Sequence, residues 1–145
     1  MEMSFAFFAD AATVPPDGKF YALGGGFSAL ALPSLPGMAS FAVVAGFRFG
    51  TADAGKVHLV ELRFVDTVGK LVLPPATMRF ESAGPPPTGT GEVSVSTVSV
   101  LQPTLGEPGE YAAEFWYEGA LINSVRLHVI EQQRPEPAPG SPPPA

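Results

Sequence analysis

Apolar and polar side chains alternate along most of this chain with a period of two. Successive side chains of a strand point to opposite faces of a sheet, so the pattern predicts strands with one face in a core. In the segment 41–49 one phase holds Phe41, Val43, Ala45, Phe47 and Phe49. In the segment 56–66 the apolar phase holds Val60, Leu62 and Phe64, and the opposite phase holds Glu61 and Arg63. The second segment is typical of an antiparallel strand with one face in water.

Further strands are predicted near residues 72, 80, 97, 114 and 126. Clusters of Pro, Gly and acidic residues separate them, and Gly69 suits a hairpin turn. No helix of normal length fits between these strands. Between residues 92 and 102 the apolar phase switches from Val93 and Val95 to Val98 and Val100. Either a bulge or a crossing between two sheets explains the switch, or the strand has two partly apolar faces.

The final predicted hairpin joins the segments 110–119 and 121–131 through a tight turn at Gly119. Tyr111 follows a Leu and a Pro-Gly pair at a strand entrance, which is similar to the tyrosine corner of immunoglobulin-like domains. Eight to ten short strands without helices predict an all-β fold, an immunoglobulin-like antiparallel β-sandwich over residues 1–131. The 145 residues fit one such domain.

Residues 132–145 form a Pro-rich segment that we expect to be a disordered tail. Proline cannot donate ladder hydrogen bonds, and the segment has no large apolar side chains to offset the entropy of ordering. Polyproline II character follows from this composition. A motif for an SH3-type groove is the alternative, but the usual Arg-x-x-Pro-x-x-Pro spacing fails at Gly140.

Composition points to a partner. Charged residues make up 15% of the chain, against about 25% in an ordinary soluble domain, while 46% of the residues are hydrophobic. Such a chain has more apolar area than a monomer covers easily, and burial against another chain removes it from water. The net charge of −6 and the scattered basic residues exclude the basic patch on which nucleic-acid affinity depends. We therefore expect a protein partner or self-association, and no nucleic acid.

The N-terminal residues do not resemble a targeting segment. A short apolar run follows Glu2 and contains Asp10, with no positively charged region before it, so we interpret it as the first strand of a cytoplasmic protein. No stretch reaches the eighteen apolar residues of a membrane span. The chain has no cysteine, which excludes disulfides, thiolate nucleophiles and Cys-rich zinc sites.

The three glycines at 24–26 raise the question of a phosphate-binding loop. Residues 24–29 fit G-x-G-x-x-A after a predicted strand. A dinucleotide site needs a helix next, because the pyrophosphate binds free helix N–H groups, but Pro33 and Pro36 stand where that helix would run. We therefore predict a bulge or a sharp connection between strands that lets Phe20, Leu23 and Phe27 reach the core. No cofactor is expected.

Catalytic and metal-ligating patterns are weak. His58 and His128 are the only histidines, and without cysteine a zinc site would depend on carboxylates from unidentified places. Four aspartates stand singly in separate turns, which does not suit calcium: Asp10, Asp17, Asp53 and Asp66. Three glutamates alternate outward as solvated strand faces do: Glu61, Glu114 and Glu118. A G-x-S-x-G elbow is absent from the sequence. We predict a non-enzyme, with no catalytic, cofactor-binding or metal-binding residues.

The strongest contact candidate is Trp116. It alternates with Phe115 and shares its phase with Glu114 and Glu118, so we expect it on the outer face of its strand. An outward Trp among acids suits a protein or sugar contact, and the alternative is a Trp covered by the tail or a loop. The candidate contact residues are Trp116, Tyr117, Arg126 and His128.

Two stretches resemble a family of short uncharacterised bacterial all-β proteins, a domain of unknown function. In that family a Phe-rich first strand ends in Ala-Asp-Ala, as at residues 9–11. A Gly-Lys-Phe-Tyr strand with glycines follows, as at 18–26, and a late Pro-Gly-x-Tyr hairpin recurs, as at 108–111. The resemblance covers about residues 4–130. It implies a compact all-β fold and a bacterial origin, and it supplies no catalytic residue.

These observations predict a non-catalytic β-sandwich that binds protein, itself or another chain, through an apolar sheet face or edge. The alternative is a small-molecule or carbohydrate-binding module that uses the outward aromatic residues of the last hairpin. A third possibility is an enzyme with a dispersed site around His58 or His128.

Overall fold

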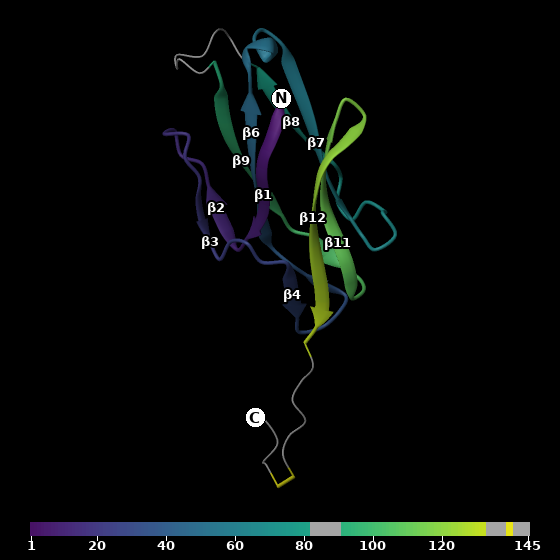
Figure 1. Ribbon diagram of the computed structural model, residues 1–145. Helices are drawn as coiled ribbons and strands as arrows, with labels where there is room; N and C mark the ends of the chain where they lie inside the picture. The colour runs from purple at the N-terminus through teal and green to yellow at the C-terminus, as the bar shows by residue number, and fades with distance from the viewer. Residues whose placement is uncertain (82–90, 133–138, 141–145) are drawn as a thin grey trace.

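The computed structural model describes residues 1–81, 91–132 and 139–140, and the first two ranges form an all-β fold (Figure 1). The strands of the N-terminal half are β1 (Glu2–Ala9), β2 (Ala11–Thr13), β3 (Tyr21–Leu23), β4 (Ala29–Leu32), β5 (Gly37–Met38) and β6 (Phe41–Phe49). The later strands are β7 (Val57–Val65), β8 (Ala76–Glu81), β9 (Val93–Leu101), β10 (Thr104–Leu105), β11 (Gly109–Tyr117) and β12 (Ala120–Glu131). A single 3-10 turn, η1 (Thr51–Asp53), is the only helical element of the described residues.

Two larger sheets pack face to face, as in a β-sandwich. One has three strands in the order β1-β6-β9, and the other has five in the order β4-β12-β11-β7-β8. All pairs in these sheets are antiparallel except β4 with β12, which run parallel. Two small ladders, β2-β3 and β5-β10, complete the strands. The prediction of an all-β fold built of antiparallel sheets is confirmed, while the immunoglobulin-like type stays a prediction.

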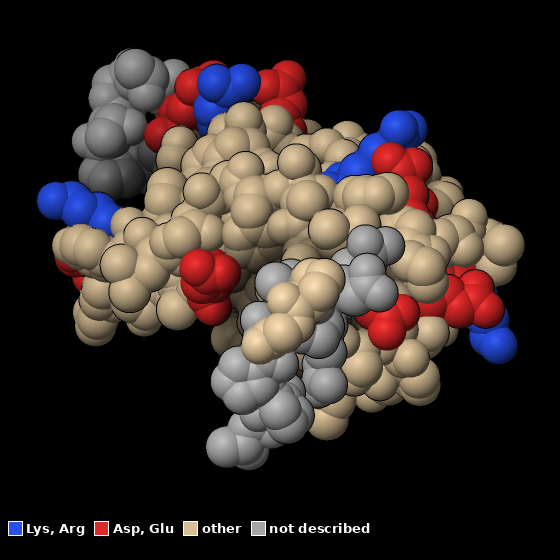
Figure 2. All heavy atoms as spheres, turned by 90° about the horizontal axis from the view of Figure 1, so that it is seen from below, with Lys and Arg blue, Asp and Glu red and all other residues tan. Residues whose placement is uncertain are grey.

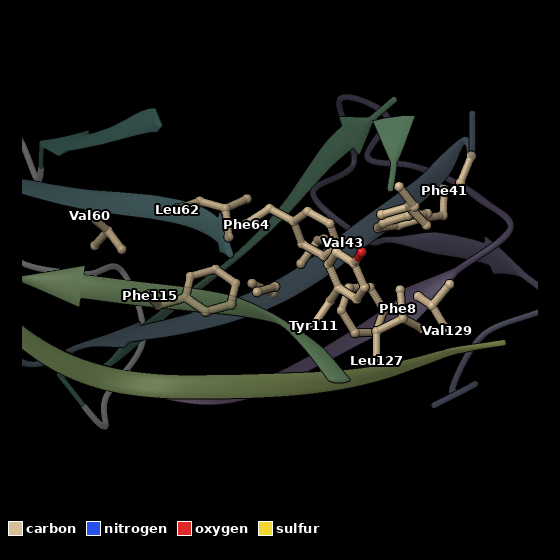
Figure 3. Close-up of a cluster of buried hydrophobic side chains, with 14 of the residues drawn as sticks. Phe8, Phe41, Val43, Val60, Leu62, Phe64, Tyr111, Phe115, Leu127 and Val129 are labelled. Atoms are coloured by element: carbon tan, nitrogen blue, oxygen red, sulfur yellow. The ribbon is translucent and has the colours of Figure 1, made fainter. Parts of the chain in front are cut away.

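The core lies between the two sheets and is built by the predicted alternation. Phe41 of β6 packs edge-on against Phe64 of β7, with ring centroids 5.6 Å apart, and Phe47 meets Phe115 of β11 at 6.3 Å. Figure 3 shows side chains from both sheets converging in this layer. Burial of such large apolar side chains is the main favourable term in folding. The fully buried members include Phe8, Phe41, Phe47, Phe64, Phe115, Leu127 and Val129.

The final hairpin confirms two local predictions. Glu118 and Gly119 both have positive φ, 50° and 77°, which makes the tight turn between β11 and β12. The Tyr111 hydroxyl donates a hydrogen bond to the Glu107 carbonyl at 2.7 Å, the contact expected of a tyrosine corner. The backbone bond fixes the entrance of β11, and the ring of Tyr111 stacks on Phe64 in the core.

Strand β9 decides between the two explanations of its phase switch. It pairs with β6 in an unbroken register, from Val93 opposite Phe49 to Leu101 opposite Phe41. The strand therefore has no bulge and does not change sheets within these residues; it has two partly apolar faces. Its inner face carries Val93 and Val95, and its outer face carries Val98 and Val100.

Two other predictions need correction or stay open. No strand forms near residue 72: after the turn at Gly69 the chain makes only a single bridge, between Val65 and Leu71, and β8 begins at Ala76. Two consecutive prolines at 74 and 75 explain the delay, because proline has no N–H for a ladder. The prediction of a disordered tail over 132–145 falls almost wholly outside the described residues.

Candidate interaction surfaces

The β2-β3 hairpin, residues 11–23, is a flap on the outer face of the three-stranded sheet. Phe5 and Phe7 of β1 pair with Gly46 and Val44 of β6, out of phase with the core residues, so their rings point outward. Phe20 packs on both rings, with centroids 5.3 Å and 5.7 Å away. Figure 1 shows the flap on the side of the molecule away from β11 and β12. The flap thus covers part of an apolar outer face that would otherwise meet water.

The glycine trio connects the flap to β4. Gly24 and Gly26 have φ of +61° and +86°, and the Gly26 N–H donates to the Phe8 carbonyl at 2.8 Å. A Cβ at Gly24 would overlap the carboxylate of Asp10, so only glycine fits there. The next element is the strand β4, and no helix begins at the glycines. The prediction of a sharp connection between strands is confirmed, and the helix that a dinucleotide loop needs does not follow the glycines.

The sequence predicted that Phe20, Leu23 and Phe27, which flank the glycines, all reach the core. The structure confirms this for only one of them. Phe27 stacks on Phe8 with ring centroids 5.9 Å apart and does reach the core. Phe20 lies on the outer aromatic cluster instead, and Leu23 is 73% exposed. The prediction was wrong for these two residues because the flap leaves the sandwich after Ala9, which turns β3 away from the core.

The outer surface of the flap carries exposed apolar side chains, and its charged residues, Asp17 and Lys19, lie at and beside the turn of the hairpin. Tyr21 is 53% exposed in addition to Leu23, and both lie on its outward side, paired with Thr13 and Ala11. A depression of about 560 Å³ follows the hairpin; its lining residues are Ala11, Ala12, Thr13, Phe20, Tyr21, Ala22 and Leu23. Exposed apolar surface of this kind marks contact sites in soluble proteins. Figure 2 views the molecule from the end that carries β4, where uncharged side chains fill most of the view and charged ones are scattered singly or in small groups.

Trp116 lies on the outer face of the five-stranded sheet, as predicted. It is half-buried, because the guanidinium of Arg63 sits over its ring at 4.7 Å from the centroid. Its Nε1 donates to Glu114 at 3.3 Å, and Arg63 is hydrogen-bonded to Glu61. A shallow depression of about 300 Å³ adjoins the ring and includes Thr77 and Glu118. The ring is therefore covered by a neighbouring strand's cation, and neither the tail nor a loop is needed to explain its burial.

Tyr117 does not face outward with Trp116. It belongs to the inward phase of β11, packs against the core, and its hydroxyl lies 2.6 Å from Nδ1 of His58. The interpretation of Tyr117 as an outward aromatic contact is wrong, because adjacent strand residues point to opposite faces. Burial raises the pKa of the Tyr117 hydroxyl, and the charge of Glu118 adds to the increase.

His58, the second residue of β7, is buried and belongs to a polar cluster at the start of that strand. Its Nε2 lies 3.7 Å from the Asp53 carboxylate, which also binds the Met1 ammonium at 3.1 Å and accepts the Gly50 N–H at 2.8 Å. The Gly50 hydrogen bond, followed by the ammonium, holds the pKa of the Asp53 carboxyl below its usual range. This cluster satisfies the only buried histidine of the described residues.

Arg126 and His128 lie on the same outer face as Trp116 but not beside it. Arg126 pairs across the strands with Ala112, four residues from Trp116, or about 13 Å along β11. Arg126 forms an exposed ion pair with Glu110 at 3.7 Å, and the His128 N–H donates to the Ser28 carbonyl. The four candidate residues therefore do not form one site: Trp116, Arg126 and His128 spread over one face, and Tyr117 lies behind it.

Among residues 1–81, 91–132 and 139–140, no three His, Asp or Glu side chains lie close enough to hold a metal ion. His58 and His128 lie on opposite faces of the sheet, inward and outward. Within the described part of the chain, no helix is both long and apolar enough to cross a membrane.

Comparison with known proteins places the chain in a family. Residues 4–130, which run from β1 into β12, match the profile of a family of unknown function, DUF6941. The chain belongs to this family. The match takes in the strands of both larger sheets and also the flap, and it ends before the Pro-rich segment. The resemblance to an uncharacterised all-β family is thereby confirmed. No curated protein matches the chain.

Two features were missed by reasoning from the sequence, although signals for both exist. His58 stands in phase with Val60 and Leu62, which indicates an inward histidine that needs a buried partner, and Asp53 lies in the preceding turn. The flap has two three-residue strands, too short for a clear alternation, but the loop Pro15-Pro16-Asp17-Gly18 between them carries turn chemistry.

Proposed function

We propose that this chain is a non-catalytic β-sandwich that works by binding protein, and that the flap is its contact surface. The observation that carries the proposal is the uncharged depression of about 560 Å³ along the flap, next to the exposed side chains of Tyr21 and Leu23. Interfaces favour aromatic and aliphatic side chains at their centre and few charges. The bacterial origin and the cytoplasmic location expected above belong to this proposal.

Anchoring supports the flap as a contact surface. Phe20 fixes it on Phe5 and Phe7, and the Asp10 N–H donates to the Leu23 carbonyl at 3.0 Å. Tyr21 is fixed as well, because its hydroxyl donates to Asp17 at 3.0 Å. A surface that is held in place before binding loses less entropy when a partner docks.

Site-specific photo-crosslinking tests the proposal. A benzophenone amino acid at Thr13, beside Tyr21, should capture one defined protein in cells of the source organism, and Leu23→Glu should remove that product. The matched control carries the crosslinker at Thr77, on the outer face of the five-stranded sheet. Equal products from both positions, or a product that survives Leu23→Glu, would contradict the proposal.

The alternative proposal is a small-molecule or carbohydrate-binding module at Trp116. The depression of about 300 Å³ beside the ring offers hydroxyl and carboxylate groups from Thr77, Glu61 and Glu118. A sugar would have to displace Arg63 to stack on the ring, and Tyr117 supplies no second platform. Because Trp116 is the single tryptophan, its fluorescence reports binding directly. A panel of sugars that leaves both this fluorescence and the melting temperature unchanged would dispose of the alternative.

A further inference from the structure

The two larger sheets have four edge strands, β1, β9, β4 and β8. These edges differ in how well they are protected against pairing with an additional strand. A free strand edge carries unpaired N–H and C=O groups, and proteins usually protect it with charges, prolines, bulges or short length. β8 carries Arg79 and Glu81 and follows two prolines; β4 has four residues and ends before Pro33. β1 carries Glu2 and a register shift between Met3 and Phe5. These three edges each have a protecting feature.

Within β9 itself none of these protecting features occurs, although Glu92 precedes the strand and Pro103 follows it. The strand extends over nine residues, Val93–Leu101, without charge, proline or bulge, and consists only of Val, Ser, Thr and Leu. Its one strand partner in the described part of the chain is β6, so its other edge pairs with no described strand. Val100, on its outer face, is 64% exposed. An uncharged, regular edge of about 30 Å is a template for strand addition.

We propose that β9 pairs antiparallel with β9 of a second copy of this chain, about a two-fold axis through Thr97, joining two three-stranded sheets into one of six strands. The surface is distinct from the flap, so the inference goes beyond the proposed function. A two-fold interface uses the same strand as donor and acceptor, and a second β9 is already extended, which removes the ordering cost that a flexible peptide would pay.

The register follows from the faces of the strand. Side chains paired across an antiparallel seam must lie on the same face, and a two-fold axis normal to the sheet keeps inner faces aligned. Centring on Thr97 places Val93 opposite Leu101 of the copy and Val95 opposite Ser99 on the inner side. The half-buried inner residues of β9 then continue the core across the seam. Thr97 meets its own copy, and Thr-Thr pairs are favourable across strands.

The distribution of charge along β9 allows a second copy to pair with it. The chain has a net charge of −6, so two copies repel each other on average. Along this seam, however, no charged side chain lies between residues 93 and 101. Glu92, which directly precedes the strand, falls opposite Gln102 of the copy and not opposite another Glu92. The antiparallel register therefore brings two acidic molecules together without a direct like-charge pair.

A charge-swap experiment on the full chain tests the seam. Ser96 is on the outer face and pairs with Val98 of the copy, so the two Ser96 positions are diagonal neighbours about 7–8 Å apart. Wild-type chain should be dimeric by light scattering at micromolar concentration. Ser96→Lys alone and Ser96→Glu alone should each weaken the dimer about tenfold by repulsion, and an equimolar mixture of the two variants should recover it. Thr77→Lys, on the other sheet's outer face, is the matched control and should leave the dimer unchanged.

Each outcome is decisive for the seam. A monomer across the concentration range overturns it, and so does a dimer that both Ser96 variants leave intact. Circular dichroism and melting temperature establish that the variants are folded. Leu23→Glu separates this inference from the proposed function: it should remove the flap crosslink and leave the β9 dimer unchanged. A dimer that Leu23→Glu dissolves and the Ser96 variants do not would assign self-association to the flap and refute the seam.

Discussion

The outer face of the five-stranded sheet carries ion pairs both within and between its strands, whereas the outer face of the three-stranded sheet is aromatic and lies partly under the flap. The first face holds Arg63 with Glu61, Arg79 with Glu81, and Arg126 with Glu110. The second holds the ion pair of Arg48 with Glu2, at 2.6 Å, beside Phe5, Phe7 and their flap contact Phe20. Both faces follow the same alternation along their strands, so alternation alone does not decide which face meets water.

The difference shows how a sandwich can use its two outer surfaces separately. A charged face needs no cover, because water solvates it and its exposed pairs contribute little to stability. An apolar face needs a cover, and the flap supplies one while exposing its own apolar side.

The largest effect is expected at Asp53, whose ion pair with the Met1 ammonium is partly buried, unlike the exposed ion pairs of the outer face. Asp53→Asn leaves the partly buried Met1 ammonium without its counter-charge, and should lower the free energy of unfolding by about 2 kcal/mol at pH 7. Urea unfolding measures the change. Glu110→Gln, which removes the exposed partner of Arg126, is the control and should cost at most about 0.5 kcal/mol.

The same residue predicts a pH dependence. The folded pKa of Asp53 lies below its unfolded value, so its stabilisation is complete above the unfolded pKa of about 3.9 and is lost as pH falls through the folded pKa. The gap in stability between wild type and Asp53→Asn should therefore narrow in acid. A gap that stays constant from pH 7 to pH 2 would show that the Asp53 charge does not contribute.

Next in size is Gly46→Val, which tests the packing under the flap. A Cβ at Gly46 would overlap the Phe5 ring, so the ring must move and take the Phe7 and Phe20 contacts with it. Overpacking of this kind costs about 1–3 kcal/mol. The matched change on the charged face is Ala112→Val, on the outer side of β11, where we expect a smaller loss. Equal melting temperatures for the two variants would contradict the comparison.

Phe20→Ala should release the flap without unfolding the sandwich. Its ring is 37% exposed, so the loss of its two aromatic contacts should cost about 1–2 kcal/mol, less than a core phenylalanine. Amide hydrogen exchange should speed up over residues 11–23 and stay slow in β6 and β11. Tyr21→Ala, which removes an exposed ring from the same hairpin, is the control. Uniform acceleration through the core strands would instead make the flap part of the cooperative fold.

The smallest effect is expected for Arg63→Ala on the charged face. Losing the cation over Trp116 should cost about 0.5–1 kcal/mol and expose the indole to water, which shifts its fluorescence to longer wavelength. Arg79→Ala, at another exposed ion pair, should leave the emission unchanged. An unchanged emission spectrum in Arg63→Ala would show that Arg63 does not shield the Trp116 ring from water.

The core could be predicted from the sequence because a buried face forces strict alternation. Val60, Leu62 and Phe64 point inward as their phase requires, and the Gly119 turn and the Tyr111 contact follow from local turn chemistry. The flap could not be predicted, because its two strands are only three residues long. It is also held in place by contacts with residues of other strands, which the local sequence does not reveal. Phe20 looks like a core residue in the sequence, and only the placement of Phe5 and Phe7 reveals an outer cluster.

The candidate contact residues, too, could be predicted from the sequence only in part. Trp116 was placed on the outer face by its phase, but nothing local indicates that Arg63 of a neighbouring strand covers its ring. Tyr117 stood in the inward phase and should have been assigned to the core on that ground. The absence of charge on β9 is visible in the sequence, whereas its position as an outermost strand depends on the topology of the whole sheet.

The parallel pairing of β4 with β12 has a consequence for synthesis. Residues 29–32 find their ladder partner only in residues 128–131, so the five-stranded sheet cannot close until the last strand has emerged from the ribosome. Until then the aromatic segments of the first fifty residues have no complete sheet to cover them. The nascent chain is therefore expected to need a chaperone, or rapid completion, to avoid aggregating with its neighbours.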